Sequence, residues 1–219
     1  MNPAAIQLLV LAGVAVFLVL KLRSVLGTRD GFEKSKNPEL TKADSRRADL
    51  AVIEGGPDRD ITDHVDEGSD AANALVAMKA AEPGFGVDDF LQGGRGAYEM
   101  ILMGFERGDL DAIQPFLSDE VFASFSEVVK SREEQGLTIE AEFVGVRDVA
   151  LVDANYDKAS GIGEVTVKFV AELTSVVRDS AGDIVEGSKT KIKSQKDVWT
   201  FARKMGADNP NWQLVATGE

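Results

Sequence analysis

The apolar positions of this chain are distributed unevenly, and the densest run lies near its N-terminus. Between Ile6 and Leu20 no residue is charged and only Gln7 is polar. A helix over residues 3–22 would span about 30 Å, which is the thickness of the hydrocarbon core of a bilayer. The pattern therefore predicts one transmembrane helix at residues 3–22.

The charges around this run distinguish a membrane anchor from a cleaved secretory signal. A signal peptide needs a basic segment before the apolar run and small residues at a cleavage site after it, and neither pattern is found here. Lys21, Arg23 and Arg29 instead follow the run directly. Because basic flanks stay in the cytoplasm, we expect a single-pass protein with its N-terminus outside and its C-terminal domain in the cytoplasm. These membrane-flanking cations also attract anionic headgroups, so membrane lipid is an expected partner.

Residues 23–70 combine many charges with frequent glycine and proline. The beginning of this segment is mostly basic, whereas residues 48–72 carry one basic and eight acidic side chains. High charge and few aromatic residues are typical of disorder, so residues 23–70 are predicted to form a flexible charged linker. His64 stands among acidic residues such as Asp60 and Asp63, which could chelate a divalent ion weakly, but the spacing is not that of a calcium loop. We interpret them as solvated linker and expect no metal site.

Helical periodicity begins after the linker. An alanine-rich stretch at residues 71–84 predicts a short helix that ends near Pro83. A longer helix starts near Val87, because apolar side chains then recur on one helical face: Leu91, Tyr98, Leu102 and Phe105. Three glycines interrupt this helix at a cost of about 1 kcal/mol each, which predicts that another backbone approaches it closely.

Further helices are followed by strands. Residues 110–116 predict a short helix broken near Pro115, and Ser118 is a good N-cap for the next helix, which ends at Gly136. The predicted buried stripe of that helix consists of Val121, Phe122, Phe125, Val128 and Val129. After Gly136 the apolar period changes from about 3.6 residues to 2, which predicts long antiparallel strands with a break near Gly187. This order indicates an α+β fold in which helices pack on one face of a curved antiparallel sheet.

Composition narrows the functional classes. The formal net charge is −13, whereas a protein that binds duplex nucleic acid needs a basic surface, so nucleic acid is not an expected partner. The chain has no cysteine and one histidine, which excludes disulfides, thiol nucleophiles and any site that needs two imidazoles. We therefore expect no cofactor.

Several short segments of the C-terminal part resemble one known family in their order and spacing. They include Phe90-Leu91, Ala97-Tyr98, Gly108-Asp109-Leu110, Thr166-Val167-Lys168-Phe169, Asp197-Val198-Trp199 and Asn211-Trp212. Together they resemble the Tim44-like domain family, which includes the mitochondrial import-motor anchor and small bacterial relatives. The resemblance implies a cone-shaped domain of the nuclear-transport-factor-two type at residues 85–219, with an apolar pocket. It also implies a membrane-anchored adaptor at a bacterial inner membrane, which binds an unidentified protein partner in protein translocation or membrane-complex assembly.

Nine apolar side chains are candidates to line such a pocket or to fill the core, and the sequence does not separate the two roles. They are Phe90, Tyr98, Leu102, Phe122, Phe125, Phe169, Trp199, Phe201 and Trp212. Tyr98 and Asp197 could instead exchange protons in the pocket, which leaves a small-molecule isomerase or dehydratase as the alternative function. Because this domain contains no histidine, we favour the adaptor, in which no residue is catalytic.

Two sets of charged residues complete the candidate sites. Arg95 is predicted to face the apolar side of its helix, where a guanidinium needs a partner, so we expect a buried ion pair with Asp197. A basic surface stripe is predicted along one strand, formed by Lys189, Lys191, Lys193 and Lys196. The stripe is either a solvated face that discourages edge pairing or a contact for anionic lipid or an acidic partner.

Overall fold

One sheet and the helices packed on it make up residues 57–218, the part of the chain that this computed structural model describes. The predicted transmembrane helix, its flanking cations Lys21, Arg23 and Arg29, and residues 23–56 of the predicted linker lie outside these residues. Within residues 57–218, no helix combines the length and the apolar character needed to cross a bilayer.

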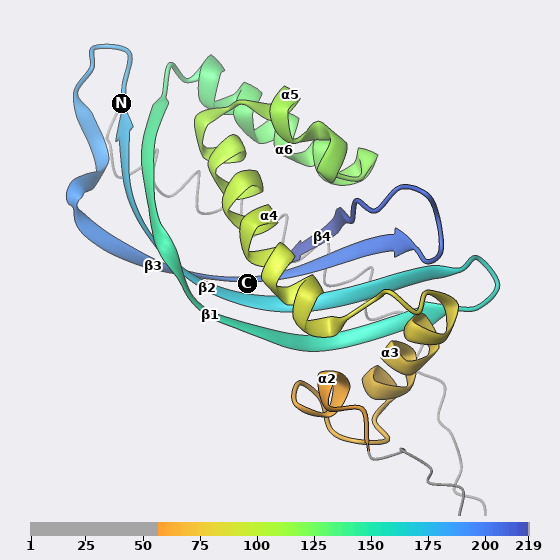
Figure 1. Ribbon diagram of the computed structural model, residues 1–219. Helices are drawn as coiled ribbons and strands as arrows, with labels where there is room; N and C mark the ends of the chain where they lie inside the picture. Colours follow the sequence, from red (N-terminus) through yellow and green to blue (C-terminus); the bar gives the residue numbers. More distant parts are fainter. Residues whose placement is uncertain (1–56, 219) are drawn as a thin grey trace, which may run out of the picture. The chain divides into compact units, whose positions relative to one another are not determined.

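The helices come first in the chain. They are α2 (Arg59–Thr62), α3 (Asp70–Ala81), α4 (Val87–Arg107), α5 (Leu110–Ile113), the 3-10 turn η1 (Gln114–Phe116) and α6 (Asp119–Glu134). The strands follow as β1 (Thr138–Asp157), β2 (Ile162–Arg178), β3 (Ile184–Lys204) and β4 (Gln213–Gly218), and they form one antiparallel sheet in the order β1-β2-β3-β4. The long strands bend strongly, and α4, α5 and α6 lie over the concave face (Figure 1).

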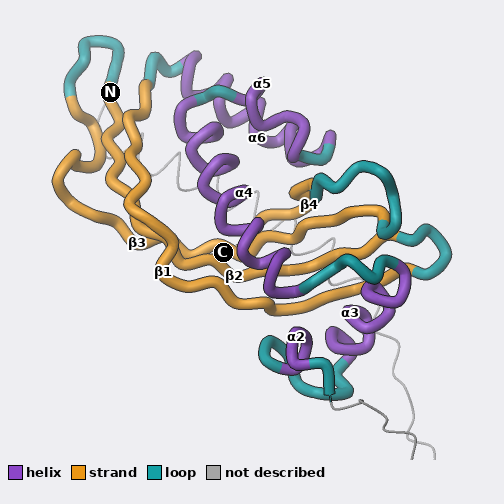
Figure 2. Tube along the Cα trace, viewed as in Figure 1, coloured by secondary structure: helices purple, strands orange, loops and turns teal. Residues whose placement is uncertain are grey.

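The helical segments and the sheet form distinct layers in Figure 2, and along residues 57–218 all the helices precede the strands. The predicted α+β fold is therefore confirmed. The four-stranded antiparallel sheet with helices on its concave face is consistent with a domain of the nuclear-transport-factor-two type.

Side-chain alternation along β2 determines which face of the sheet is covered. Every second residue from Val165 to Leu173 is buried, whereas the residues between them are partly exposed. Phe169 lies opposite Val149 of β1 and Asp197 of β3 in the ladder, so these three side chains leave the sheet on the same side. The predicted period of two is thus confirmed, and the buried side chains of β2 belong to the concave face.

The ladder between β2 and β3 is interrupted beside Gly187. This glycine has a φ of +83°, and a Cβ at its position would collide with the carbonyl oxygen of Ser175. Next to this pair the register jumps from Ser175–Ser188 to Leu173–Lys193, so the extra residues of β3 bulge out of the ladder. The predicted break near Gly187 is present, and Lys189 and Lys191 lie within it.

The start of α6 also protects the outer edge of β4. The Ser118 hydroxyl accepts a hydrogen bond from the amide of Val121 and caps α6, as predicted, while the Ser118 amide donates to the carbonyl of Leu214 in β4. Val121 and Val129 of the predicted stripe are buried. Val128 is exposed, so its predicted place in the buried stripe is wrong. The buried face of α6 is narrower than the set of apolar positions along this helix.

Helices α4 and α5 approach each other most closely at Gly104. A Cβ at this position would lie 2.5 Å from Cγ2 of Ile113 and 3.3 Å from the backbone oxygen of Asp109. Only glycine fits this contact without displacing α5. The chain can therefore turn directly from α4 into α5.

The sequence predicts close backbone approach at the three central glycines of α4 instead, and this prediction is wrong. A Cβ at Gly93 or Gly96 would meet no atom within 4 Å, and the only atom near a Cβ at Gly94 is Cζ of Phe169, at 3.9 Å. The neighbour of α4 on the sheet side is thus a ring and not a backbone. The reason is that the concave face presents large aromatic side chains toward α4.

Residues 57–70 are folded, which corrects the predicted boundary of the flexible linker at residue 70. Gly86 gives α4 no side-chain cap, and the carboxylate of Asp60 supplies it by accepting hydrogen bonds from the amides of Val87 and Asp88, at 2.8 and 2.9 Å. Ile61 is 2% exposed within the core. Helix α2 is held in place because its Asp60 accepts hydrogen bonds from free amides at the N-terminus of α4. This contact joins residues far apart in the sequence, so the pattern around residue 60 does not predict it.

An ion pair joins the C-terminus of α3 to the end of β3. Arg203 Nη2 lies 2.7 Å from Glu82 Oε1, and the other oxygen of Glu82 accepts from the amide of Gly206 at 2.7 Å. The Arg203 side chain is 8% exposed and lies over the ring of Trp212. The hydrogen bonds from Arg203 and Gly206 lower the pKa of the Glu82 carboxyl below its ordinary value. This pair therefore stabilises the fold while Glu82 is ionised.

We predict that Gly104→Ala destabilises the domain by about 1–3 kcal/mol, because its methyl group would overlap with Ile113. The matched control is Gly93→Ala in the same helix, which adds a methyl group in open space and should stabilise the domain by about 1 kcal/mol. Chemical denaturation of both variants measures the difference. Equal effects of the two substitutions would contradict the packing described for α4 and α5.

We predict that Glu82→Gln lowers the free energy of unfolding by about 2 kcal/mol at neutral pH, since it removes the charge that pairs with Arg203. A lowered pKa in the folded state means that this stabilisation is present above the unfolded pKa of about 4.3 and is lost as the pH falls through the folded value. Denaturation curves of the parent and variant should therefore converge in acid. Glu67→Gln, at an exposed position, is the control and should show no such convergence.

Candidate functional site

The nine predicted pocket-or-core residues fill the space under α4. Six of them are buried in the core: Phe90, Tyr98, Leu102, Phe169, Trp199 and Phe201. The other three are partly buried against it: Phe122, Phe125 and Trp212. Six of the rings form one connected set of contacts, with centroids 4.7 Å apart for Phe90 and Trp212, whereas Phe125 packs on Phe105. These residues act as core and do not line either of the grooves described below.

Tyr98 occupies the centre of this packing. Its side chain is fully buried, and its ring stacks on Phe169 with a centroid distance of 4.5 Å and an interplanar angle of 18°. The ring of Trp199 lies 4.6 Å away. The Tyr98 ring therefore joins α4 to both β2 and β3.

The Tyr98 hydroxyl belongs to a small polar cluster with Asp197 and Gln195. It donates to Oδ2 of Asp197 at 2.5 Å, and Nε2 of Gln195 donates to the same oxygen at 3.0 Å. Burial, followed by the contact with Asp197, raises the pKa of Tyr98 far above its ordinary value. The hydroxyl is therefore protonated throughout the physiological pH range, and its proton is donated to Asp197. Gln195 was not identified from the sequence, although its position two residues before Asp197 places both on one strand face.

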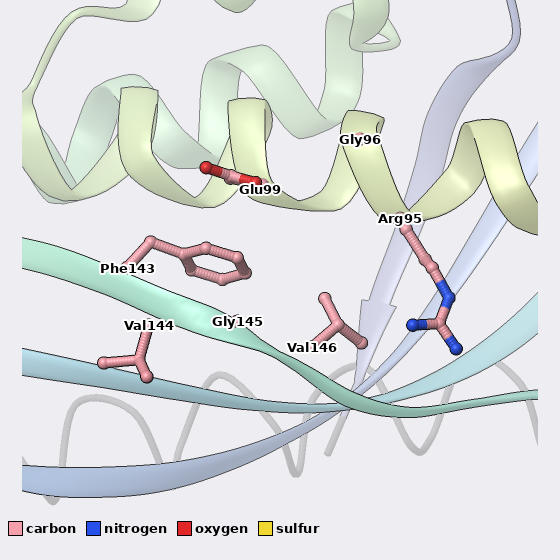
Figure 3. Close-up of a pocket in the computed structure, with 7 residues that line it drawn as sticks. All are labelled: Arg95, Gly96, Glu99, Phe143, Val144, Gly145 and Val146. Carbon is pink, nitrogen blue, oxygen red and sulfur yellow. The ribbon is translucent and has the colours of Figure 1, made fainter.

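The structure corrects the predicted ion pair between Arg95 and Asp197. The side chain of Arg95 is exposed and extends from α4 toward the side of Val146 on β1 (Figure 3). Tyr98 is the residue of α4 that reaches Asp197. The error comes from the rotation of the helix: Arg95 is at the margin of its apolar face, and the centre of that face is occupied by Tyr98 and Gly94.

Two charged residues near this cluster were missed by sequence reasoning. Glu106 lies in the last turn of α4, where burial raises the pKa of its carboxyl, partly offset by Arg132 and Lys193. Arg132 of α6 donates to the carbonyl of Phe105 at 3.3 Å, and its guanidinium lies 4.4 Å from the centroid of the Phe105 ring. These contacts hold α6 against the end of α4, and no local pattern indicates them.

The predicted basic stripe does not form a single face. Lys193 lies opposite Leu173 and Lys196 opposite Val170, so these two lysines leave the sheet on opposite sides. Lys189 and Lys191 lie in the interrupted part of the ladder, and Lys189 pairs with Glu140 at 2.5 Å. Two physical causes separate these lysines. Lys193 and Lys196 are three positions apart in a continuous ladder, so alternation sends them to opposite sides, whereas alternation does not hold in the interrupted part that carries Lys189 and Lys191.

Two open grooves lie on the surface of the described domain. The smaller groove encloses about 290 Å³ between α4 and β1, and Figure 3 shows Phe143 and Val146 facing α4 across it. The larger groove encloses about 560 Å³ between β1 and the segment from α2 to α3, and its lining includes Val152. Neither groove is lined by Tyr98 or Asp197.

The acidic surroundings of His64 belong to the larger groove. His64 Nε2 lies 2.8 Å from Asp88 Oδ1, so the imidazole is tied to the first turn of α4. Asp63, Asp66 and Asp153 also line this groove. Among residues 57–218, no three of the His, Asp and Glu side chains converge closely enough to hold a metal ion.

Two solved structures share part of this architecture at low identity. The intermembrane-space region of the chloroplast protein ARC6 gives a TM-score of 0.42 at 6% identity, covering 58% of this chain and 94% of that one. A periplasmic fragment of TraM gives a TM-score of 0.36 at 14% identity, covering 59% and 93%. Both likenesses are too remote to bear on function.

Sequence relatives are more informative. The mitochondrial import inner membrane translocase subunit TIM44 of Homo sapiens is 24% identical over 151 residues, which cover 67% of this chain and 33% of the human protein. TIM44 of Mus musculus is 22% identical over 151 residues, with the same coverage. TIM44-1 of Arabidopsis thaliana is 21% identical over 153 residues, which cover 67% and 32%. The chain thus spans about a third of the length of the curated relatives that it matches.

The sequence profile of the Tim44-like domain matches residues 71–219, which is more than half of the chain. The match takes in nearly all of α3, α4 to α6 and the whole sheet. The match therefore begins before the domain predicted at residues 85–219 and includes the short helix predicted at residues 71–84. The chain belongs to the Tim44-like domain family.

Proposed function

We propose that this chain is a non-enzymatic adaptor, anchored at a bacterial inner membrane, whose domain binds a partner protein during protein translocation or membrane-complex assembly. The family supports the coarse role, since the curated relatives are named as subunits of an inner-membrane translocase. The predicted helix at residues 3–22 and the cations Lys21, Arg23 and Arg29 support the anchor and an orientation with the N-terminus outside. We assign contact with membrane lipid to these three cations, because basic side chains next to a membrane attract anionic headgroups.

The observation that carries the proposal is the filled interior beneath α4. An isomerase or dehydratase of this fold would need substrate beside Tyr98, but the Tyr98 side chain is fully buried between Phe169 and Trp199. Its raised pKa also keeps the hydroxyl protonated, so it does not act as a base near neutral pH. The packing therefore favours an adaptor over the enzymatic alternative.

The filled core supports partner binding on the outer surface and not in an interior pocket. The larger groove offers an accessible apolar side chain, Val152, which is 52% exposed, beside the carboxylates of Asp63, Asp66 and Asp153. An apolar contact rimmed by charges is the usual composition of a protein–protein interface. We therefore assign the partner-binding surface to this side of β1.

We predict that Tyr98→Phe lowers the free energy of unfolding by about 1–2 kcal/mol, because the ring stack remains while Asp197 loses a hydrogen bond. Partner binding should not change, since Tyr98 does not reach the surface. The matched control is Tyr156→Phe, outside the cluster, which should change stability by less than about 0.5 kcal/mol. A stably folded Tyr98→Phe protein that has lost partner binding would contradict the assignment of binding to the surface.

We predict that a photoreactive residue at Val152 of the full chain, in native membranes, crosslinks to components of a protein-translocation or membrane-assembly complex. The same residue at Glu127, exposed on α6, is the control and should not capture them. The membranes should also retain the chain in alkaline carbonate. Release by carbonate would overturn the anchor, and captured products without any such component would overturn the adaptor role.

A further inference from the structure

The two walls of the smaller groove come from α4 and β1. Arg95, Gly96 and Glu99 form its α4 wall, and residues 143–146 of β1 form the other (Figure 3). Val144 is the extra residue of a bulge, because the ladder pairs Phe143 and Gly145 with adjacent residues of β2 and skips it. Its side chain is 52% exposed, so the groove presents apolar surface that the described domain does not cover.

No contact within residues 57–218 requires a glycine at position 96. A Cβ at Gly96 would meet nothing within 4 Å, although glycine in a helix interior costs about 1 kcal/mol relative to alanine. The absence of a side chain leaves the backbone of α4 accessible at the centre of the groove wall. Close approach by another helix is the packing for which a small residue is useful at such a position.

The charges on this wall have opposite signs and lie one turn apart. Arg95 and Glu99 are both exposed and are separated by about 6 Å along the helix axis, from a rise of 1.5 Å per residue. If a second α4 ran antiparallel to the first with the two-fold axis at Ala97, midway between Arg95 and Glu99, Arg95 of each copy would meet Glu99 of the other. The pattern is therefore complementary to itself, as a two-fold interface requires.

We propose that the groove is occupied by a second copy of this chain, with the two α4 helices antiparallel and Gly96 next to the crossing point at Ala97. Each α4 would also cover the exposed apolar surface of the other copy's groove. A lipid headgroup would complement Arg95 but be repelled by Glu99. With a net charge of −13, two copies repel each other over most surfaces, and the two reciprocal ion pairs offset this repulsion here. The proposal goes beyond the adaptor function and uses a different groove.

The chain has no cysteine, so a single introduced cysteine reports this contact directly. We expect the full-length Gly96→Cys protein, in the membranes of the cells that produce it, to form a disulfide-linked dimer under mild oxidation. Asp111→Cys, exposed on α5, is the control and should stay monomeric. Failure of Gly96→Cys to crosslink, or crosslinking to a different protein, overturns the proposal.

Charge reversal then distinguishes a second copy from any other occupant. In the Gly96→Cys background, Arg95→Glu should abolish the disulfide-linked dimer, because each interface then brings carboxylates together. Adding Glu99→Arg restores opposite charges between two identical copies, so the double reversal should restore the dimer. If it does not, the proposal is wrong. Retained capture at Val152 in the dimer-deficient Arg95→Glu protein would show that the adaptor function stands independently.

Discussion

The fully buried stack of Tyr98 on Phe169 is the contact on which the rest of this domain depends. It fixes the height and rotation of α4 above the concave face, while the bond from the Tyr98 hydroxyl to Asp197 satisfies a polar group that would otherwise be costly to bury. A single residue thus connects α4 to two strands. Because α4 is fixed in this way, Arg95 and Glu99 lie at the margin of its buried face and remain exposed.

The filled core changes how a fold of this type can act. A hollow cone would bind a ligand among its aromatic residues, but here those residues are packed in the core, and the two grooves described above lie along β1. Function is therefore assigned to surfaces. The sheet edges are correspondingly protected: bulges interrupt the free edge of β1, and Ser118 covers β4 by donating its amide to Leu214. These features discourage the pairing of another chain's strand with the sheet edges, and they leave the side-chain surfaces accessible to a partner.

The elements could be predicted from the sequence because their signals are local. The cap at Ser118, the break near Gly187 and the alternation along β2 each depend on neighbouring residues, and the structure contains all of them. The candidate sites were predicted less well. The place of Arg95 depends on the rotation of α4 by a fraction of a turn, and the places of Lys189 and Lys191 depend on where the β3 ladder is interrupted.

The sequence by itself determined the types of the elements, most of their ends, the acidic charge and the family resemblance. Only the tertiary structure decided that the aromatic residues fill the core, that Tyr98 and not Arg95 is the partner of Asp197, and that Asp60 caps α4. The physical reason is distance along the chain. Tyr98 and Asp197 are 99 positions apart, and Asp60 and Asp88 are 28 apart, so these contacts exist only after the helices and the sheet have packed.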